Sequence, residues 1–276
     1  MIKNAIAGAS LKIAKKIKAD AIIVISDENL LEGAKTNCPV LHIKKSFTML
    51  GQSLSSLQES IPEKLVSRTT NDVNRLEEML IMAHINSKIK DDELIVGVID
   101  FENVSSIVVF DMKESEMFKR LKECGERADR EVIQSILFIS LELGISGYEG
   151  KKIGTAFIIG DSEEVLKRSY QSIMNPFKGY SIEVTDKKNW DTIKEFTQID
   201  GMFIIDEKGR VIAAGRYMET DTKNIDIQNG LGGRHMAAAT ITHETQAIAV
   251  VLSQSGMVRL YKDGLPTVEL DSSKSF

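Results

Sequence analysis

The stretch Ala21-Ile22-Ile23-Val24-Ile25 is a short apolar run in which every side chain after the alanine is β-branched. Such a run is typical of a strand buried on both faces of a sheet that helices cover. The segment before it, Asn4–Lys18, carries apolar residues at helical spacing. Further runs of this kind lie at residues 39–43, 94–99 and 106–110. Strands that alternate with helices predict a small α/β domain with a largely parallel sheet, which we place at residues 1–112.

The longest helical pattern of the chain lies at residues 115–143. We expect it to form one helix that opens a second domain, residues 113–276, and to be stopped by Gly144 and the segment Gly147–Gly150. The turn residues Asp206–Gly209 between two apolar runs predict a hairpin.

The rest of the second half predicts strands and helices in a mixed, partly antiparallel sheet. Strands are expected at 153–160, 202–205, 211–214, 247–252 and 257–261, and helices at 186–198 and 234–245. The fold class is therefore α/β in both halves.

Composition excludes several classes of protein. The 276 residues are 42% hydrophobic and 27% charged, which is typical of a globular protein, and no apolar run approaches the roughly 20 residues of a membrane span. With no signal peptide pattern, we expect a cytoplasmic protein without a membrane partner. The net charge of -5, with no basic stripe, argues against nucleic acid as a partner. Cys38 and Cys124 have no metal-ligand company and are expected to be buried side chains.

The glycine pair Gly232-Gly233 precedes Arg234, His235 and an alanine-rich helix. Two glycines let the backbone approach a ligand, and the unpaired N–H groups of a helix start attract anions. Arg234 adds a forked positive donor and His235 a second. The sequence predicts a phosphate site here, and an ordinary loop-to-helix junction remains the alternative.

Asp200-Gly201 stands just before a buried strand. A carboxylate at a sheet edge can bind Mg²⁺ or Mn²⁺ or orient a hydroxyl, and a simple turn is the alternative. The loop that carries Asp221 and Asp226 could close over a ligand or be only solvated. The chain has neither a GxxxxGK[ST] nor a GxSxG pattern, so P-loop and α/β-hydrolase chemistry are excluded.

Four segments in order and at matching gaps resemble the diadenylate cyclase domain, over roughly Glu126 to Leu270. They are residues 200–205, 213–218, 232–238 and 250–256. The first half resembles the small α/β C-terminal domain of pyruvate kinase. This pairing is similar to the archaeal type of diadenylate cyclase.

The resemblance implies a reaction that joins two ATP molecules into cyclic di-AMP and releases two pyrophosphates, with Mn²⁺ or Mg²⁺. Two sites must then face each other, which implies a homodimer or a higher homo-oligomer. By resemblance, Asp200 takes part in metal and 3′-hydroxyl positioning, and the catalytic residues are Asp200, Gly201, Arg234 and His235. The implied nucleotide-binding residues are Tyr217 and Met218 beside the adenine, and Gly232, Gly233, Arg234 and Ser253 at the phosphates.

Three positions depart from the family pattern. Met202 stands for an alanine, Gly233 for a threonine, and Met236 for a second arginine. A lost charge-assisted hydrogen bond costs roughly 1.5–3 kcal/mol, or about one to two decades of affinity or rate. Two alternatives therefore stay open: a nucleotide-sensing protein with weak or no catalysis, and a nucleotidyl transfer that yields linear dinucleotides.

Overall fold

The computed structural model describes residues 2–43, 80–81, 89–90, 92–101, 104–219 and 231–272. These residues form two compact units, and the division between them falls after Lys119, within helix α3 (Glu116–Cys124). Each unit has its own sheet. Among the described residues, none of the helices has the length and apolar character needed to span a bilayer.

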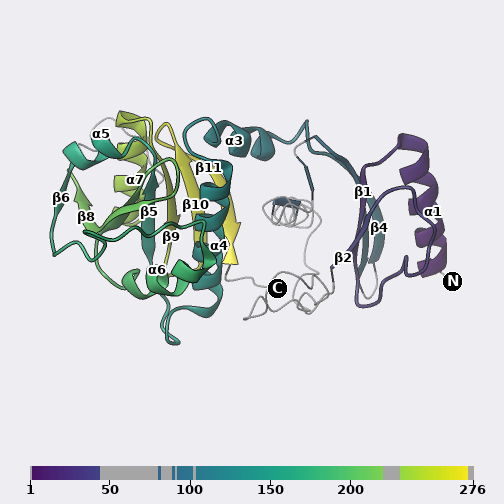
Figure 1. Ribbon diagram of the computed structural model, residues 1–276. Helices are drawn as coiled ribbons and strands as arrows, with labels where there is room; N and C mark the ends of the chain where they lie inside the picture. The colour runs from purple at the N-terminus through teal and green to yellow at the C-terminus, as the bar shows by residue number, and fades with distance from the viewer. Residues whose placement is uncertain are drawn as a thin grey trace. The chain divides into compact units, whose positions relative to one another are not determined.

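The first unit is a four-stranded sheet with helix α1 (Ile2–Ile17) packed against it (Figure 1). Strand β1 (Ala21–Ile25) pairs in parallel with β2 (Val40–Ile43) and β3 (Leu94–Phe101), and all five of its residues are buried. Strand β4 (Val104–Asp111) pairs antiparallel with β3. The predicted α/β class and largely parallel sheet are confirmed, and β4 is antiparallel because it follows β3 directly, without a crossover helix.

The second unit is built on a seven-stranded sheet in the order β11-β10-β9-β5-β7-β8-β6. Only β5 and β7 are parallel neighbours, so the predicted mixed sheet is confirmed. The strands are β5 (Thr155–Ile159), β6 (Ser169–Gln171), β7 (Met202–Ile205), β8 (Val211–Met218), β9 (Ile248–Leu252), β10 (Met257–Lys262) and β11 (Leu265–Asp271). The helices are α4 (Arg130–Ser146), α5 (Ser162–Lys167), α6 (Trp190–Phe196) and α7 (Gly233–Glu244), and a 3₁₀ turn spans Lys187–Asn189. The sequence analysis did not predict α5, β6 or β11.

The single helix predicted over residues 115–143 is wrong: the structure has two helices, α3 and α4, with a break between them. Gly125 follows α3, and the Asp129 N–H before α4 donates to the carbonyl of Glu207, 2.9 Å away. Gly144 does not stop α4 but lies inside it. Glycine is needed there because a Cβ would come within 2.0 Å of the Ser272 hydroxyl. The helix ends at Ser146, before Gly147 with its positive φ of 66°.

Helices cover both faces of the second sheet. Ala238, Ala239 and Ile241 of α7 pack in one buried cluster with Ala156 of β5 and Val251 of β9. Helix α4 contributes no residue to that cluster although it contacts β5, β9 and β10, and it lies on the opposite side of the sheet (Figure 1). The start of α7 is thereby held above the carboxyl end of β9.

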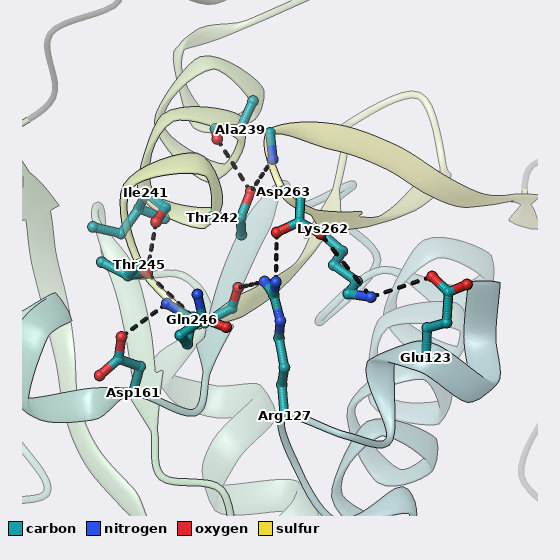
Figure 2. A network of polar contacts seen from close by, with 12 residues as sticks. Glu123, Arg127, Asp161, Ala239, Ile241, Thr242, Thr245, Gln246, Lys262 and Asp263 are labelled. Atoms are coloured by element: carbon teal, nitrogen blue, oxygen red, sulfur yellow. Dashed lines mark hydrogen bonds and ion pairs between the residues drawn. The ribbon is translucent and has the colours of Figure 1, made fainter.

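Polar contacts tie the last turn of α7 to the strands around it (Figure 2). The Thr242 hydroxyl accepts the N–H of Gly264 at 3.2 Å, and the Thr245 hydroxyl accepts that of Ala247 at 3.2 Å. The Asp161 carboxylate accepts the N–H of Gln246 at 2.8 Å.

Arg127, in the break before α4, joins the same network (Figure 2). Its guanidinium donates to the Ala247 carbonyl at 3.4 Å and to the Asp263 carboxylate at 2.5 Å. Lys262 bridges to Glu123 of α3 at 3.2 Å. These contacts, which we call the anchor, fix the carboxyl end of α7. Because the helix is rigid, they also determine where its amino end lies.

Candidate functional site

A cavity of about 470 Å³ opens at the amino end of α7. The first residues of α7, the end of β9, the turn into β10 and one glycine before β5 form its walls. The residues that line it are Gly154, Leu231, Gly232, Gly233, Arg234, His235, Val251, Leu252, Ser253, Gln254, Ser255, Met257 and Arg259. Five of the predicted site residues, Gly232 to His235 and Ser253, thus share one cavity.

The glycine pair leaves room at this cavity. A Cβ at Gly232 or Gly233 would meet no atom within 4 Å, and no side chain caps the helix. The space beside the pair and the partial positive charge of a helix start are what an anionic group requires.

Arg234 connects the cavity to Asp200. One terminal nitrogen of its guanidinium lies 3.1 Å from the Asp200 carboxylate. Its Nε is buried and has no hydrogen-bond partner among the described residues. A buried donor without a partner is costly, so this nitrogen is suited to an oxygen supplied by a ligand.

Asp200 is held as a charged carboxylate on an exposed edge. It accepts hydrogen bonds from the Tyr217 hydroxyl and from the Gly201 N–H, the latter at 3.0 Å. The Tyr217 bond, the Gly201 bond and the charge of Arg234 together lower the pKa of Asp200, against a smaller opposing effect of burial. Gly201 has φ of 103°, and a Cβ there would meet the Gly215 carbonyl carbon at 2.7 Å, so only glycine fits this approach.

Tyr217 and Met218 lie on β8, where successive side chains face opposite sides of the sheet. Tyr217 stacks on Tyr170 of β6 with ring centroids 5.7 Å apart, on the side of Asp200. Met218 packs instead against the buried cluster that holds α7. Of the two residues expected beside the adenine, Tyr217 is therefore the one in contact with another predicted site residue.

His235 differs from the expectation that it supplies positive charge. The residue is 5% exposed, and Nδ1 of its ring lies 2.9 Å from the Tyr261 hydroxyl. Burial, and then the charge of Arg259, lower the pKa of His235 to about 4. The imidazole is neutral at pH 7, because protonation would place a charge in a buried site beside an arginine. It can still offer Nε2 as a neutral hydrogen-bonding group.

Ser253 begins the turn between β9 and β10. Its hydroxyl lies 2.7 Å from that of Ser255 and accepts the Met257 N–H at 3.1 Å. Between the two serine hydroxyls one hydrogen stays available, because only one of them is needed for the bond that joins the pair.

Arg259 on β10 is a cavity residue that the sequence analysis missed. It lies opposite Glu269 of β11, with Nε 3.3 Å from the carboxylate, and its side chain is 14% exposed. The contact is an ion pair without hydrogen-bond geometry, since the same Nε has no hydrogen-bond partner among the described residues. Alternation along a strand could have flagged Arg259, because it stands between the buried residues Val258 and Leu260. The cavity therefore has two arginines in its wall.

A metal ion would find few protein ligands here. The described residues contain no group of three or more His, Cys, Asp or Glu that could hold one. Mg²⁺ is commonly bound by one or two carboxylates together with substrate phosphates, and the exposed Asp200 fits that mode. The loop of Asp221 and Asp226 lies outside the described residues.

Two family models match different parts of the chain. Residues 142–265 match the DAC family model, described as DisA bacterial checkpoint controller nucleotide-binding. Residues 5–113 match DacZ_A, described as a probable sensor domain, and not the pyruvate kinase domain to which the sequence was likened. The resemblance to the diadenylate cyclase domain is thereby confirmed.

Two curated relatives are archaeal. The diadenylate cyclase of Methanocaldococcus jannaschii is 41% identical over 171 residues, which are 62% of this chain and 52% of the relative. That of Haloferax volcanii is 40% identical over 148 residues, 53% of this chain and 55% of the relative. The chain thus spans about half the length of the curated relatives it matches.

Solved structures give weaker likenesses. A hypothetical membrane spanning protein from Bacillus cereus is 14% identical with a TM-score of 0.43, over 55% of this chain and 68% of that one. DacA from Staphylococcus aureus is 18% identical with a TM-score of 0.36, over 50% of this chain and 85% of that one.

Proposed function

We propose that the chain is a diadenylate cyclase that condenses two ATP molecules into cyclic di-AMP and two pyrophosphates. The observation that carries this is the contact between Arg234 and Asp200. It links the Asp200 carboxylate, which lies outside the cavity lining, to the helix start and the arginines that line the cavity. A carboxylate beside a built anion site is the arrangement that a nucleotide with both a ribose hydroxyl and a triphosphate requires.

Each turnover makes and breaks two bonds of the same kind. The 3′-hydroxyl oxygen of one ATP attacks the α-phosphorus of the other, and the bond from that phosphorus to the bridging oxygen of pyrophosphate breaks. The hydroxyl proton passes to solvent water, and the second hydroxyl repeats the step in the opposite direction. Phosphoryl transfer of this kind depends on positioning and on stabilisation of charge rather than on covalent chemistry by the protein.

The side chains divide these tasks. Arg234 and Arg259 offer charge to the phosphates, Ser253 a hydroxyl, and Gly232 and Gly233 backbone N–H groups in open space. Asp200, which the hydrogen bond from Tyr217 keeps charged, accepts a hydrogen bond from the 3′-hydroxyl and so orients it. Gly201 keeps the backbone beside Asp200 in the one conformation that this position allows.

Asp200 is also the residue that would hold Mn²⁺ or Mg²⁺, with substrate phosphates as the further ligands. When bound, such an ion neutralises charge on the phosphate oxygens. Arg259 supplies part of this neutralisation from the protein itself, which offsets the arginine absent at Met236.

The reaction needs two ATP molecules whose reacting ends face each other, and one cavity holds one of them. A two-fold symmetric encounter of two copies brings the two sites together. We therefore propose a homodimer as the active form. A specific rate that falls on dilution of the enzyme supports the dimer, and one that stays constant at all dilutions contradicts it.

The test is incubation with ATP and either Mn²⁺ or Mg²⁺, followed by liquid chromatography and mass spectrometry. Cyclic di-AMP is expected from the wild type and absent from Asp200→Asn. The matched control is Asp191→Asn, which removes the same charge from a side chain of α6 that is 97% exposed. Loss of product in both variants, or in neither, contradicts the role of Asp200.

A nucleotide sensor with weak or no catalysis is the second candidate, and the departures at Gly233 and Met236 favour it. ATP or cyclic di-AMP would then bind without turnover. A product of linear dinucleotide mass would instead identify a different nucleotidyl transfer.

A further inference from the structure

The first unit contains a second cavity, of about 450 Å³. The residues that line it lie between Leu11 and Cys38, so none of them takes part in the proposed reaction. It lies where the last turns of α1 meet the amino ends of β1 and β2. Four lysines line it: Lys12, Lys15, Lys18 and Lys35. We propose that this cavity binds a small organic phosphate, with the phosphate at the lysines and the organic part on an apolar base.

Among the described residues, the side chains of these lysines have no partners. Although the chain is acidic overall, no hydrogen bond or ion pair joins the side chain of any of the four to another described residue. Lys3, by contrast, on the same helix, is paired with Asp100 at 3.2 Å. Four like charges around one cavity repel one another, and an anion between them relieves that repulsion.

The base of the cavity belongs to the core. Leu11, Ala14 and Ile22 line it, and all three take part in the apolar cluster between α1 and the sheet. Thr36 and Asn37 add polar groups at its side. A wall of lysines above an apolar base matches a phosphorylated small molecule better than a bare inorganic ion, which would leave the base uncovered.

Lys18 adds an independent observation. It has φ of 56°, the left-handed conformation that ends many helices and that glycine adopts without steric cost. The Ala19 N–H bonds back to the Ala14 carbonyl at 2.9 Å, as expected of such a helix end. A lysine at this position costs stability relative to glycine, and its side chain lines the cavity.

An ordinary explanation accounts for only part of this pattern. Basic residues at a helix carboxyl end offset the helix dipole, which is equivalent to about half a negative charge. That effect explains one lysine in the last turn of α1. It does not explain Lys35, which comes from the segment before β2, or four positive charges at one cavity.

Cys38 provides a local readout. Its half-buried thiol lines the cavity, and burial raises its pKa. The other thiol, Cys124, is buried in the second unit, with its pKa raised to about 11. Modification of Cys38 by a maleimide, followed by peptide mass mapping, therefore reports on this cavity and not on the cavity beside α7.

The experiment uses the full chain and phenyl phosphate as the probe, with inorganic phosphate and chloride at equal ionic strength for comparison. Phenyl phosphate is expected to slow the modification of Cys38 with a defined midpoint, at lower concentration than inorganic phosphate does. Lys15→Ala should raise that midpoint about fivefold, the effect of one nearby charge. Lys16→Ala is the matched control, since Lys16 is the next residue on α1 and does not line the cavity.

Lys18→Gly separates binding from folding. It should raise the same midpoint about fivefold while the melting temperature stays equal or increases, because glycine suits the left-handed position. A purely structural lysine gives no change in the midpoint. Equal shifts for Lys15→Ala and Lys16→Ala, equal protection by phenyl and inorganic phosphate, or no protection at all would each overturn the proposal.

Discussion

The guanidinium of Arg234 lies 3.1 Å from the carboxylate of Asp200, a residue 34 positions earlier in the chain. Arg234 lies in the first turn of α7, and Asp200 lies just before β7. Their contact therefore joins two elements that are distant in the sequence. The pair is partly exposed and contributes little to stability by itself. The effect of the pair is positional: it holds the carboxylate beside the start of α7.

Replacing Arg234 by Met should lower the turnover of ATP by about 10- to 100-fold. The change removes a charge-assisted hydrogen bond to a phosphate and leaves Asp200 without its cation. The rate of cyclic di-AMP formation measures the effect. Arg210→Met, an exposed arginine in the turn before β8, is the matched control and should leave the rate unchanged.

Arg259→Met should weaken ATP binding by about tenfold while adenosine binding stays the same, because Arg259 faces the phosphates in the proposed site. Calorimetric titration with the two ligands separates these effects. Adding Met236→Arg to this variant should restore part of the ATP affinity. If adenosine and ATP weaken together, Arg259 shapes the cavity rather than binding the phosphates.

Tyr217→Phe should raise the pKa of Asp200, since the Tyr217 hydrogen bond is the largest cause of its lowering. A carboxyl whose folded-state pKa is lowered adds stability above its unfolded pKa and loses it as the pH falls through the folded value. The exposed position keeps that effect on stability small. A carbon-detected NMR titration of the metal-free protein follows the carboxyl directly. Tyr170→Phe removes a hydroxyl from the ring stacked on Tyr217 and should leave this pKa in place.

The buried His235 should make the protein sensitive to mild acid. Its folded-state pKa of about 4 lies below the ordinary value of 6.5. Its contribution is therefore complete above pH 6.5 and is lost as the pH falls toward 4, by about 3 kcal/mol at most. Urea unfolding of wild type and His235→Gln between pH 7 and pH 4 tests this expectation. Parallel pH curves for the two proteins would contradict the neutral, buried imidazole.

Gly201→Ala should lower the free energy of unfolding by at least about 2 kcal/mol, because the new Cβ meets backbone atoms at a positive φ. Gly232→Ala places the same methyl group in open space and should cost less than about 1 kcal/mol. Urea unfolding at pH 7 compares the two variants. Similar losses would show that the contact between Gly201 and Gly215 is not the constraint.

Much of the architecture follows from local patterns that the sequence displays directly. Ala21–Ile25 is a strand because its β-branched residues are all buried, and Asp206–Gly209 makes a hairpin turn because its residues suit one. The sequence analysis missed the break between α3 and α4 because the apolar residues of both helices fit one continuous helical spacing. Gly144 misled for the opposite reason: it is a packing glycine against Ser272, which only the tertiary structure reveals.

The candidate site divides in the same way. The sequence predicts two parts of the candidate site. The residue types at Gly232, Gly233 and Arg234 are typical of a helix start, and Asp200 precedes a buried strand. Strand alternation marks Arg259 as a charged residue between two buried ones, but it does not place Arg259 in the cavity wall. That placement and the neutral state of His235 depend on which elements lie side by side. No local pattern states that Met218 faces the core while Tyr217 faces Asp200.

The anchor built from Arg127, Thr242 and Thr245 holds α7 at the end remote from the cavity (Figure 2). The residues that position α7 are thus different from the residues that would contact a nucleotide. Mutation can rewrite positions such as Gly233 and Met236 without displacing the scaffold, so ligand preference can drift over generations while the architecture persists. Variants at the anchor should have the opposite effect: the ligand-binding residues are unchanged, but the helix that carries them is displaced.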